Sequence, residues 1–147
     1  MSPTVRVTPV AQAIRGRLME IPKLQGRVYW PNIPEGETIP LDERGRVLPY
    51  AILHTGGVFR AAARHRGIGS SRDDVKHHTI AVEVVAGNYY VALDVADDVR
   101  DKLEGYEPPH CTQMVEDTSG STKNPVDSTL KPVRYVYPLY YALMISP

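Results

Sequence analysis

Two stretches of the chain place apolar residues at helical spacing. The first stripe follows Thr8-Pro9, a pair typical of a helix start, and stops at Pro22. It consists of Val10, Ile14, Leu18 and Ile21. The second stripe lies between Asn88, an N-cap residue, and Gly105, a residue that commonly closes helices. It consists of Tyr89, Ala92, Leu93, Ala96, Val99 and Leu103. These patterns predict amphipathic helices over residues 9–21 and 89–104.

Short β-rich runs lie between and after the two helical stretches. They cover residues 27–30, 48–55, 77–85, 110–116 and 133–145. In the third run Ile80, Val82 and Val84 alternate with smaller or polar residues, a pattern typical of a half-buried strand. The last run is apolar at both parities, which predicts a buried strand, or one covered by a neighbour, that bends at Pro138.

Polar, turn-rich segments connect these runs at residues 31–47, 58–76 and 117–132. The last two have too few apolar residues to pack alone, so we expect them to be mobile in an isolated subunit. The order of elements predicts an α+β fold over residues 1–147 as a single domain. We expect a two-layer sandwich in which two helices pack on one mixed sheet of four or five strands, with long exposed loops.

Composition narrows the function classes. The 147 residues carry 17 Lys and Arg against 17 Asp and Glu, so the chain lacks the global positive charge that usually drives nucleic-acid binding. The single cysteine, Cys111, excludes an internal disulfide and a multi-cysteine zinc site. No stretch resembles a signal peptide or a membrane span, and we expect a soluble protein that is not exported and has no membrane partner. Tyrosine supplies 9 of the 11 aromatic residues, which suits either strands or interfaces.

Candidate catalytic groups do not combine into a recognisable set. His77 and His78 are neighbours on a predicted strand and point to opposite faces, so one metal ion cannot easily bind both. The same alternation separates Cys111 from His110, which favours a partly buried cysteine over a thiolate nucleophile. The glycine-rich residues 67–71 lack the lysine of a phosphate-binding loop. The sequence therefore predicts a protein that is not an enzyme and has no cofactor or metal.

Charge is distributed unevenly along this neutral chain. Acidic residues with helical spacing lie on the second predicted helix: Asp94, Asp97, Asp98 and Asp101. They could form the site of a small metal-dependent hydrolase, but a solvated helix face is favoured, because no motif links them to a His or Lys. Basic residues lie on the first predicted helix and in the segment after residue 58, where the candidates are Arg60, Arg64, Arg66 and Arg72. If the two charges lie on opposite sides, copies can join head to tail and close into a ring.

Several segments resemble those of tail terminator (tail-completion) proteins of tailed bacteriophages. They are Gly26-Arg27-Val28-Tyr29-Trp30-Pro31, Leu48-Pro49-Tyr50-Ala51-Ile52-Leu53, the passage through Gly87-Asn88 into the second helix, and the final apolar strand. The resemblance covers nearly the whole chain. It implies a structural virion protein that forms a ring, typically a hexamer, without catalytic activity.

Further expectations follow from this resemblance. The ring would cap the tail tube, terminate tail polymerisation and provide the surface for head-tail joining. Its partners would be other copies of the chain, the tail tube protein and a neck or head-completion protein, and DNA would pass through its lumen without sequence-specific binding. The protein would be made in the host cytoplasm and would lie in the virion at the head-tail junction. Another neck, head-tail connector or minor tail protein is the alternative, and the hydrolase is less favoured.

Overall fold

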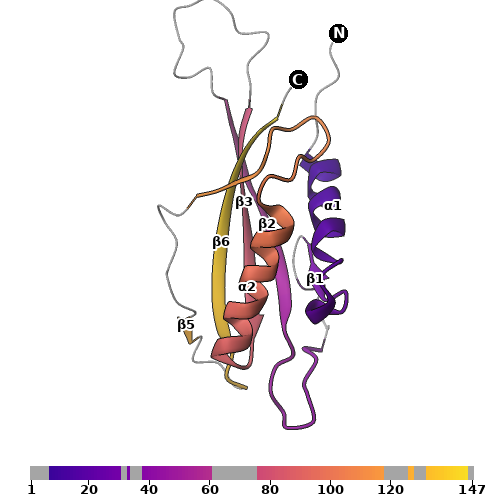
Figure 1. The fold of residues 1–147 in the computed structure, drawn as a ribbon, viewed down its shortest axis with the longest axis vertical. Helices are drawn as coiled ribbons and strands as arrows, with labels where there is room; N and C mark the ends of the chain where they lie inside the picture. The colour runs from indigo at the N-terminus through magenta and orange to yellow at the C-terminus, as the bar shows by residue number, and fades with distance from the viewer. Residues whose placement is uncertain are drawn as a thin grey trace, which may run out of the picture.

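Three strands of eleven residues each form the centre of a mixed sheet: β2 (Tyr50–Arg60), β3 (Lys76–Ala86) and β6 (Tyr135–Ile145) (Figure 1). The computed structural model describes residues 7–30, 33, 38–60, 76–117, 126–127 and 132–145. The other elements are α1 (Val7–Leu18), the 3-10 turn η1 (Pro22–Leu24), β1 (Val28–Tyr29), α2 (Tyr89–Leu103), β4 (Val115–Glu116) and β5 (Val126–Asp127). The fold is therefore α+β with one sheet, as predicted from the sequence.

The strand order is β1-β2-β3-β6-β4, and β5 also pairs with β6. Only the β1–β2 pair is parallel; the other described pairs are antiparallel. The register between β3 and β6 is continuous from Lys76 opposite Ile145 to Ala86 opposite Tyr135, and Pro138 lies opposite Glu83 within it. Strands β2 and β3 continue past the ends of both helices, so their paired ends form one extremity of the described structure (Figure 1).

Both helices cover the same face of the sheet. α1 packs against β1 and β2, α2 packs against β3 and β6, and the helices also contact each other. The predicted stripes face inward: Ile14 and Leu18 of α1 and Val99 and Leu103 of α2 are fully buried. They meet buried residues of alternating parity on the strands, among them Leu53, Ile80, Val82, Leu139 and Tyr141. Burial of this shared apolar surface joins the two layers.

The opposite face of the sheet has no helix among the described residues. Its lower part is covered by the segment before β2, where Val47, Tyr50 and Val85 form a second, smaller buried cluster. Beyond that cluster, Met144 of β6 and Val115 of β4 are exposed. This arrangement explains why β6 is apolar at both parities: one parity is buried under the helices, and the other lies on the helix-free face.

The observed helix ends agree only in part with the ends predicted from the sequence. Asn88 caps α2, because its Oδ1 accepts hydrogen bonds from the backbone nitrogens of Tyr90 (2.8 Å) and Val91 (3.3 Å). Gly105, with a φ of 78°, follows the helix as predicted. α1 instead begins at Val7, so Thr8 lies in its first turn and is not the N-cap. The neighbouring proline is tolerated there, because the first-turn nitrogens have no partner within the helix.

Three of the predicted segments, 58–76, 110–116 and 117–132, differ from the structure. β2 extends to Arg60 and β3 begins at Lys76, so residues 58–60 and 76 belong to strands and not to the predicted loop. The predicted loop at 117–132 contains β5, and the predicted strand at 110–116 is reduced to β4 plus an isolated bridge between Cys111 and Ile145. The expected mobility of the two loops falls on residues 61–75, 118–125 and 128–131, which lie outside the described residues.

Candidate functional site

Helix α2 presents its acidic residues away from the sheet. Since its apolar stripe is buried, the intervening positions point outward, and Asp94, Asp97 and Asp101 are exposed, whereas Asp98 is half-buried. The four aspartates predicted as site residues therefore share one helix surface.

Two of these aspartates are already paired within the subunit. Asp98 Oδ2 lies 3.2 Å from Lys23 Nζ, next to η1, and Asp97 Oδ1 lies 3.0 Å from Arg100 Nη1 on the other flank of α2. Among the described residues, Asp94 and Asp101 form no ion pair. The residues available to a partner are therefore Asp94 and Asp101, a smaller set than the sequence pattern suggested.

The basic candidates have a different placement. Arg60 is the last residue of β2, at the end of the sheet beyond the helices, and its side chain is outside the described residues (Figure 1). Arg64, Arg66 and Arg72 also lie outside the described residues. The acidic candidates, in contrast, lie on the middle and C-terminal part of α2.

Basic residues of the first helix do not lie opposite the acidic surface. Arg17 Nε donates a hydrogen bond to the carbonyl oxygen of Lys102 at 2.9 Å, and the Lys23–Asp98 pair joins η1 to α2. Because α1 and α2 are neighbours in one layer, the charges there are partly matched within one subunit. Arg17 and Lys23 therefore lie beside the acidic surface of α2 and not on the opposite side of the subunit.

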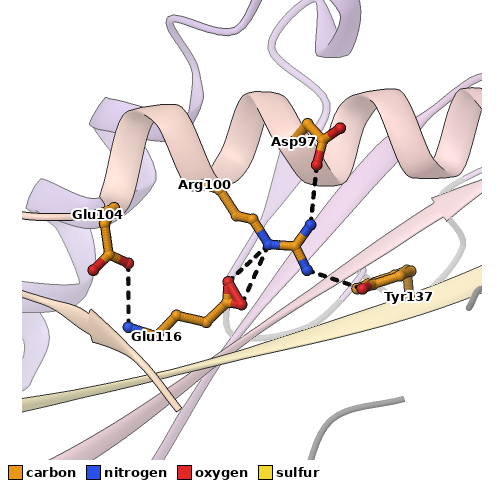
Figure 2. Close-up of polar contacts among 5 residues, drawn as sticks. All are labelled: Asp97, Arg100, Glu104, Glu116 and Tyr137. Atoms are coloured by element: carbon orange, nitrogen blue, oxygen red, sulfur yellow. Dashed lines mark hydrogen bonds and ion pairs between the residues drawn. The ribbon is translucent and has the colours of Figure 1, made fainter. Parts of the chain in front are cut away.

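A polar network at the C-terminal half of α2 was missed by the sequence analysis (Figure 2). Arg100 Nε donates to Glu116 Oε1 at 2.7 Å and to Oε2 at 3.2 Å, and Nη2 donates to Tyr137 Oη at 2.9 Å. The guanidinium also lies 5.3 Å from the centre of the Tyr137 ring. The backbone nitrogen of Glu116 donates to Glu104 Oε2 at 3.2 Å. One arginine therefore joins α2 to β4 and β6.

The electrostatics of this network favour a permanently charged arginine. Burial alone would lower the pKa of Arg100, but its hydrogen bonds to Glu116 and Tyr137, together with the charge of Glu116, outweigh burial and raise the pKa above its usual range. The spacing of Asp97 and Arg100 could have indicated an ion pair along the helix. Glu116 comes from a distant strand, and no sequence signal connects it to Arg100.

Two polar side chains are fully buried without a hydrogen-bond partner: His78 on β3 and Tyr141 on β6. Burial lowers the pKa of His78, so its neutral form is favoured. Burial, reinforced by the nearby charges of Glu116 and Glu104, raises the pKa of Tyr141. Both residues face the helix layer from the sheet, where they are part of the interior and are not accessible to a substrate.

The remaining candidates offer little chemistry. Cys111 is partly buried, as predicted, with its Sγ 3.3 Å from the carbonyl oxygen of Pro109, and burial raises the pKa of its thiol. Residues 67–71 lie outside the described residues. Within the described ranges, no three His, Cys, Asp or Glu residues are grouped so that they could hold a metal ion. None of the helices in those ranges has the length and apolar character that crossing a membrane requires.

A shallow groove of about 320 Å³ lies between η1 and α2. It is lined by Ile21, Pro22, Lys23, Asp98, Asp101 and Lys102. The buried Ile21 and the neighbouring Pro22 provide an apolar base, and charged side chains form the rim. This combination is suited to binding another chain.

The chain matches no protein-family model, and its sequence is not significantly similar to that of any curated protein.

Proposed function

We propose that this protein is a tail terminator of a tailed bacteriophage. It assembles into a ring, hexameric by the resemblance stated above, on the end of the tail tube. There it terminates tube polymerisation and provides the surface to which the neck or head-completion protein attaches. DNA passes through the lumen without sequence-specific contacts, and the role of the protein in the virion is structural.

The separation of charge in one subunit is the observation that supports assembly most strongly. Exposed Asp94 and Asp101 lie on α2, whereas Arg60 ends β2 at the extremity beyond the helices. An isologous contact pairs unlike charges only where both lie within one shared interface, whereas a head-to-tail contact pairs charges that lie on different sides of the subunit. Repetition of a head-to-tail contact satisfies both, and it closes into a ring when the rotation between copies permits.

The architecture supports the same proposal. The described elements follow the order helix, strand, strand, strand, helix and final apolar strand on which the resemblance rests. The polar groups that the structure brings together at α2 are held by ion pairs and hydrogen bonds between elements of the same subunit. Their arrangement stabilises the sandwich and leaves charged surface for contacts with other chains.

An elongation assay tests this function. The tail tube protein from the same phage is polymerised in vitro, and tube growth is followed by light scattering and negative-stain microscopy. Addition of the chain at one ring equivalent per tube should stop growth, and heat-denatured chain serves as the control. Unchanged growth at a tenfold excess of folded chain would contradict the proposal. Stable attachment along the tube wall would point to the alternative, another tail or neck component.

A further inference from the structure

We propose that two copies of the free chain pair with each other through the outer edge of β2. The two strands run antiparallel about a twofold axis at Gly56-Gly57, so the occupant of this edge is the same strand of a second copy. The pairing itself does not rest on the proposed function. Only its consequence for ring assembly, given below, rests on it.

The outer edge of β2 is uncovered over most of its length in the described structure. β1 pairs with β2 only as far as Ile52. Residue 31 is a proline, which has no N–H to extend that ladder. The chain after β1 is found at Ile33 and Ile39 on the second buried cluster, at the end of the sheet away from Arg60. Beyond β1, no described strand lies against this side of β2.

The opposite edge of the sheet, in contrast, is capped within the subunit. The backbone nitrogen of Gly105 donates to the carbonyl oxygen of Met114 at 3.0 Å, and the nitrogen of Met114 donates to that of Tyr106 at 2.9 Å. The next outward N–H, that of Glu116, donates to the Glu104 carboxylate at 3.2 Å. β2 therefore has the longest uncovered edge of the described sheet, and an uncovered edge is a template for another strand.

A bulge in β2 determines which of its backbone groups point outward. The nitrogen of Ala51 donates to the carbonyl oxygen of Arg27 at 3.0 Å, so the backbone of Ala51 faces β1. Because these groups alternate between the two sides of a strand, those of Leu53 and Thr55 also face outward. The register with β3 then shifts, since Gly56 and Gly57 together lie opposite one residue of β3.

Beyond the bulge, the outward positions change phase. The backbone of His54 faces β3, so that of its partner Ala81 faces β2. The register of β3 with β6 is continuous, and counting on in steps of two shows that His77 also faces β2. Its partner Phe59 therefore faces β3, and the backbones of the residues on either side of Phe59 face outward.

The spacing of the outward groups identifies the occupant. They belong to Leu53, Thr55, Val58 and Arg60, so the interval across the bulge is three residues and the other intervals are two. A regular strand presents such groups at every second residue and would fall out of phase across the bulge. A second β2 has the same interval, and in antiparallel orientation it places Thr55 opposite Val58 and Leu53 opposite Arg60. Glycines at the centre allow the two backbones to approach closely.

The dimer has a consequence for assembly if the chain is a tail terminator. In a ring whose copies all face the same way along the tube, two copies related by this twofold axis cannot both be members. The dimer also covers the Arg60 end of β2, which the proposed ring contact uses. It is therefore a form of the free chain that must separate before its copies enter a ring.

Removal of one outward N–H tests the contact by sedimentation of the free chain. Thr55→Pro removes this N–H without removing a hydrogen bond to β3. The matched control is Thr55→Val, which keeps the N–H and likewise loses the Oγ1 that lies 3.5 Å from Trp30 Nε1. The wild type should be dimeric at ~100 μM. Thr55→Pro should weaken the dimer at least ~10-fold relative to Thr55→Val, and thermal melts check that both variants are folded.

Disulfide cross-linking tests the register without depending on the proline variant. In a Cys111→Ser background, one chain carries Thr55→Cys and a chain with a longer tag carries Val58→Cys. The control mixture pairs Thr55→Cys with Glu43→Cys, which lies in an exposed turn at residues 42–45. After mild oxidation, the disulfide between positions 55 and 58 of unlike chains should exceed that of the control mixture at least ~10-fold.

The outcomes separate this inference from the proposed function. A wild-type chain that is monomeric at ~100 μM, or a dimer that Thr55→Pro and Thr55→Val affect equally, would show that the β2 edge is not the contact. Equal cross-linking in the two mixtures would contradict the twofold axis at Gly56-Gly57. Neither result bears on capping of tail tubes, which the elongation assay measures separately. If the dimer is found but the chain forms no ring on tubes, the proposed function is wrong and the pairing stands.

Discussion

Replacement of Arg100 tests whether one side chain joins the second helix to the sheet. The substitution Arg100→Met keeps the apolar stem and removes the guanidinium, which contacts Asp97, Glu116 and Tyr137. We expect it to destabilise the fold, because the Glu116 carboxylate and the Tyr137 hydroxyl lose their partner in a poorly hydrated place.

The solvent exposure of Arg100 and of its partners sets the size of the expected loss of stability. The Glu116 side chain is 13% exposed and that of Arg100 is 32% exposed, whereas the Asp97 side chain is 72% exposed. A fully buried pair broken on one side costs about 3–5 kcal/mol, and an exposed pair contributes about 0.2–1 kcal/mol. The Arg100–Glu116 pair lies between these two limits, and the Arg100–Asp97 pair lies near the lower limit. Arg100→Met should therefore lower the free energy of unfolding by about 2–3 kcal/mol, equivalent to roughly 5–10 °C in Tm.

Urea denaturation of a double-mutant cycle provides the measurement. Arg100→Met, Glu116→Gln and Asp97→Asn are measured singly and in pairs, with Arg44→Met as a surface control expected within about 0.5 kcal/mol of wild type. The coupling energy of Arg100 with Glu116 should be about 1–2 kcal/mol, and that with Asp97 below about 0.5 kcal/mol. Equal couplings, or an Arg100→Met effect no larger than the control, would refute the reasoning.

Five other residues of the fold give testable predictions. Burial holds the folded-state pKa of His78 below the ordinary value of 6.5, so the unfolded chain binds more protons under acid conditions. The free energy of unfolding should therefore fall as the pH drops below about 6.5. Urea titrations should show a shallower fall in His78→Phe. A steeper fall in that variant would contradict the assignment. Tyr141→Phe removes a buried hydroxyl without a partner and should be neutral or stabilise the fold by up to about 1 kcal/mol. Tyr137→Phe breaks the hydrogen bond to Arg100 and should cost about 1–2 kcal/mol. Thermal melts in which both variants shift Tm in the same direction would contradict this. At Gly87 an added Cβ would lie 2.6 Å from a backbone nitrogen, so Gly87→Ala should lower the free energy of unfolding by at least about 1 kcal/mol. Gly16 has open space around it on α1, so Gly16→Ala should raise the free energy of unfolding by up to about 1 kcal/mol. Denaturation midpoints that move in the same direction would count against the described packing.

The features that were predicted correctly from the sequence are those that depend on a local pattern of residues. The stripe ending at Leu103, the cap at Asn88 and the alternation around Val82 each depend on residues close together in the chain, and the structure confirms them. The two-residue strands β4 and β5 were misplaced or missed, because their pairing with β6 is set by tertiary contact and not by their own composition.

The candidate site was predictable only in outline. Helical spacing grouped the four aspartates correctly on one surface. Their different roles depend on Lys23 and Arg100, and nothing in the spacing of Lys23 reveals that η1 folds against α2. The groove beside Asp101 is likewise created by the packing of two segments far apart in the sequence.

Cryo-electron microscopy of tail tubes incubated with the full chain tests the central claim most directly. The proposed function predicts a closed ring of this protein at one end of each tube, with six copies around the axis, an open lumen and no further tube growth beyond it. Bare tube ends at saturating protein, or density bound only along the tube wall, would contradict the assignment as a tail terminator.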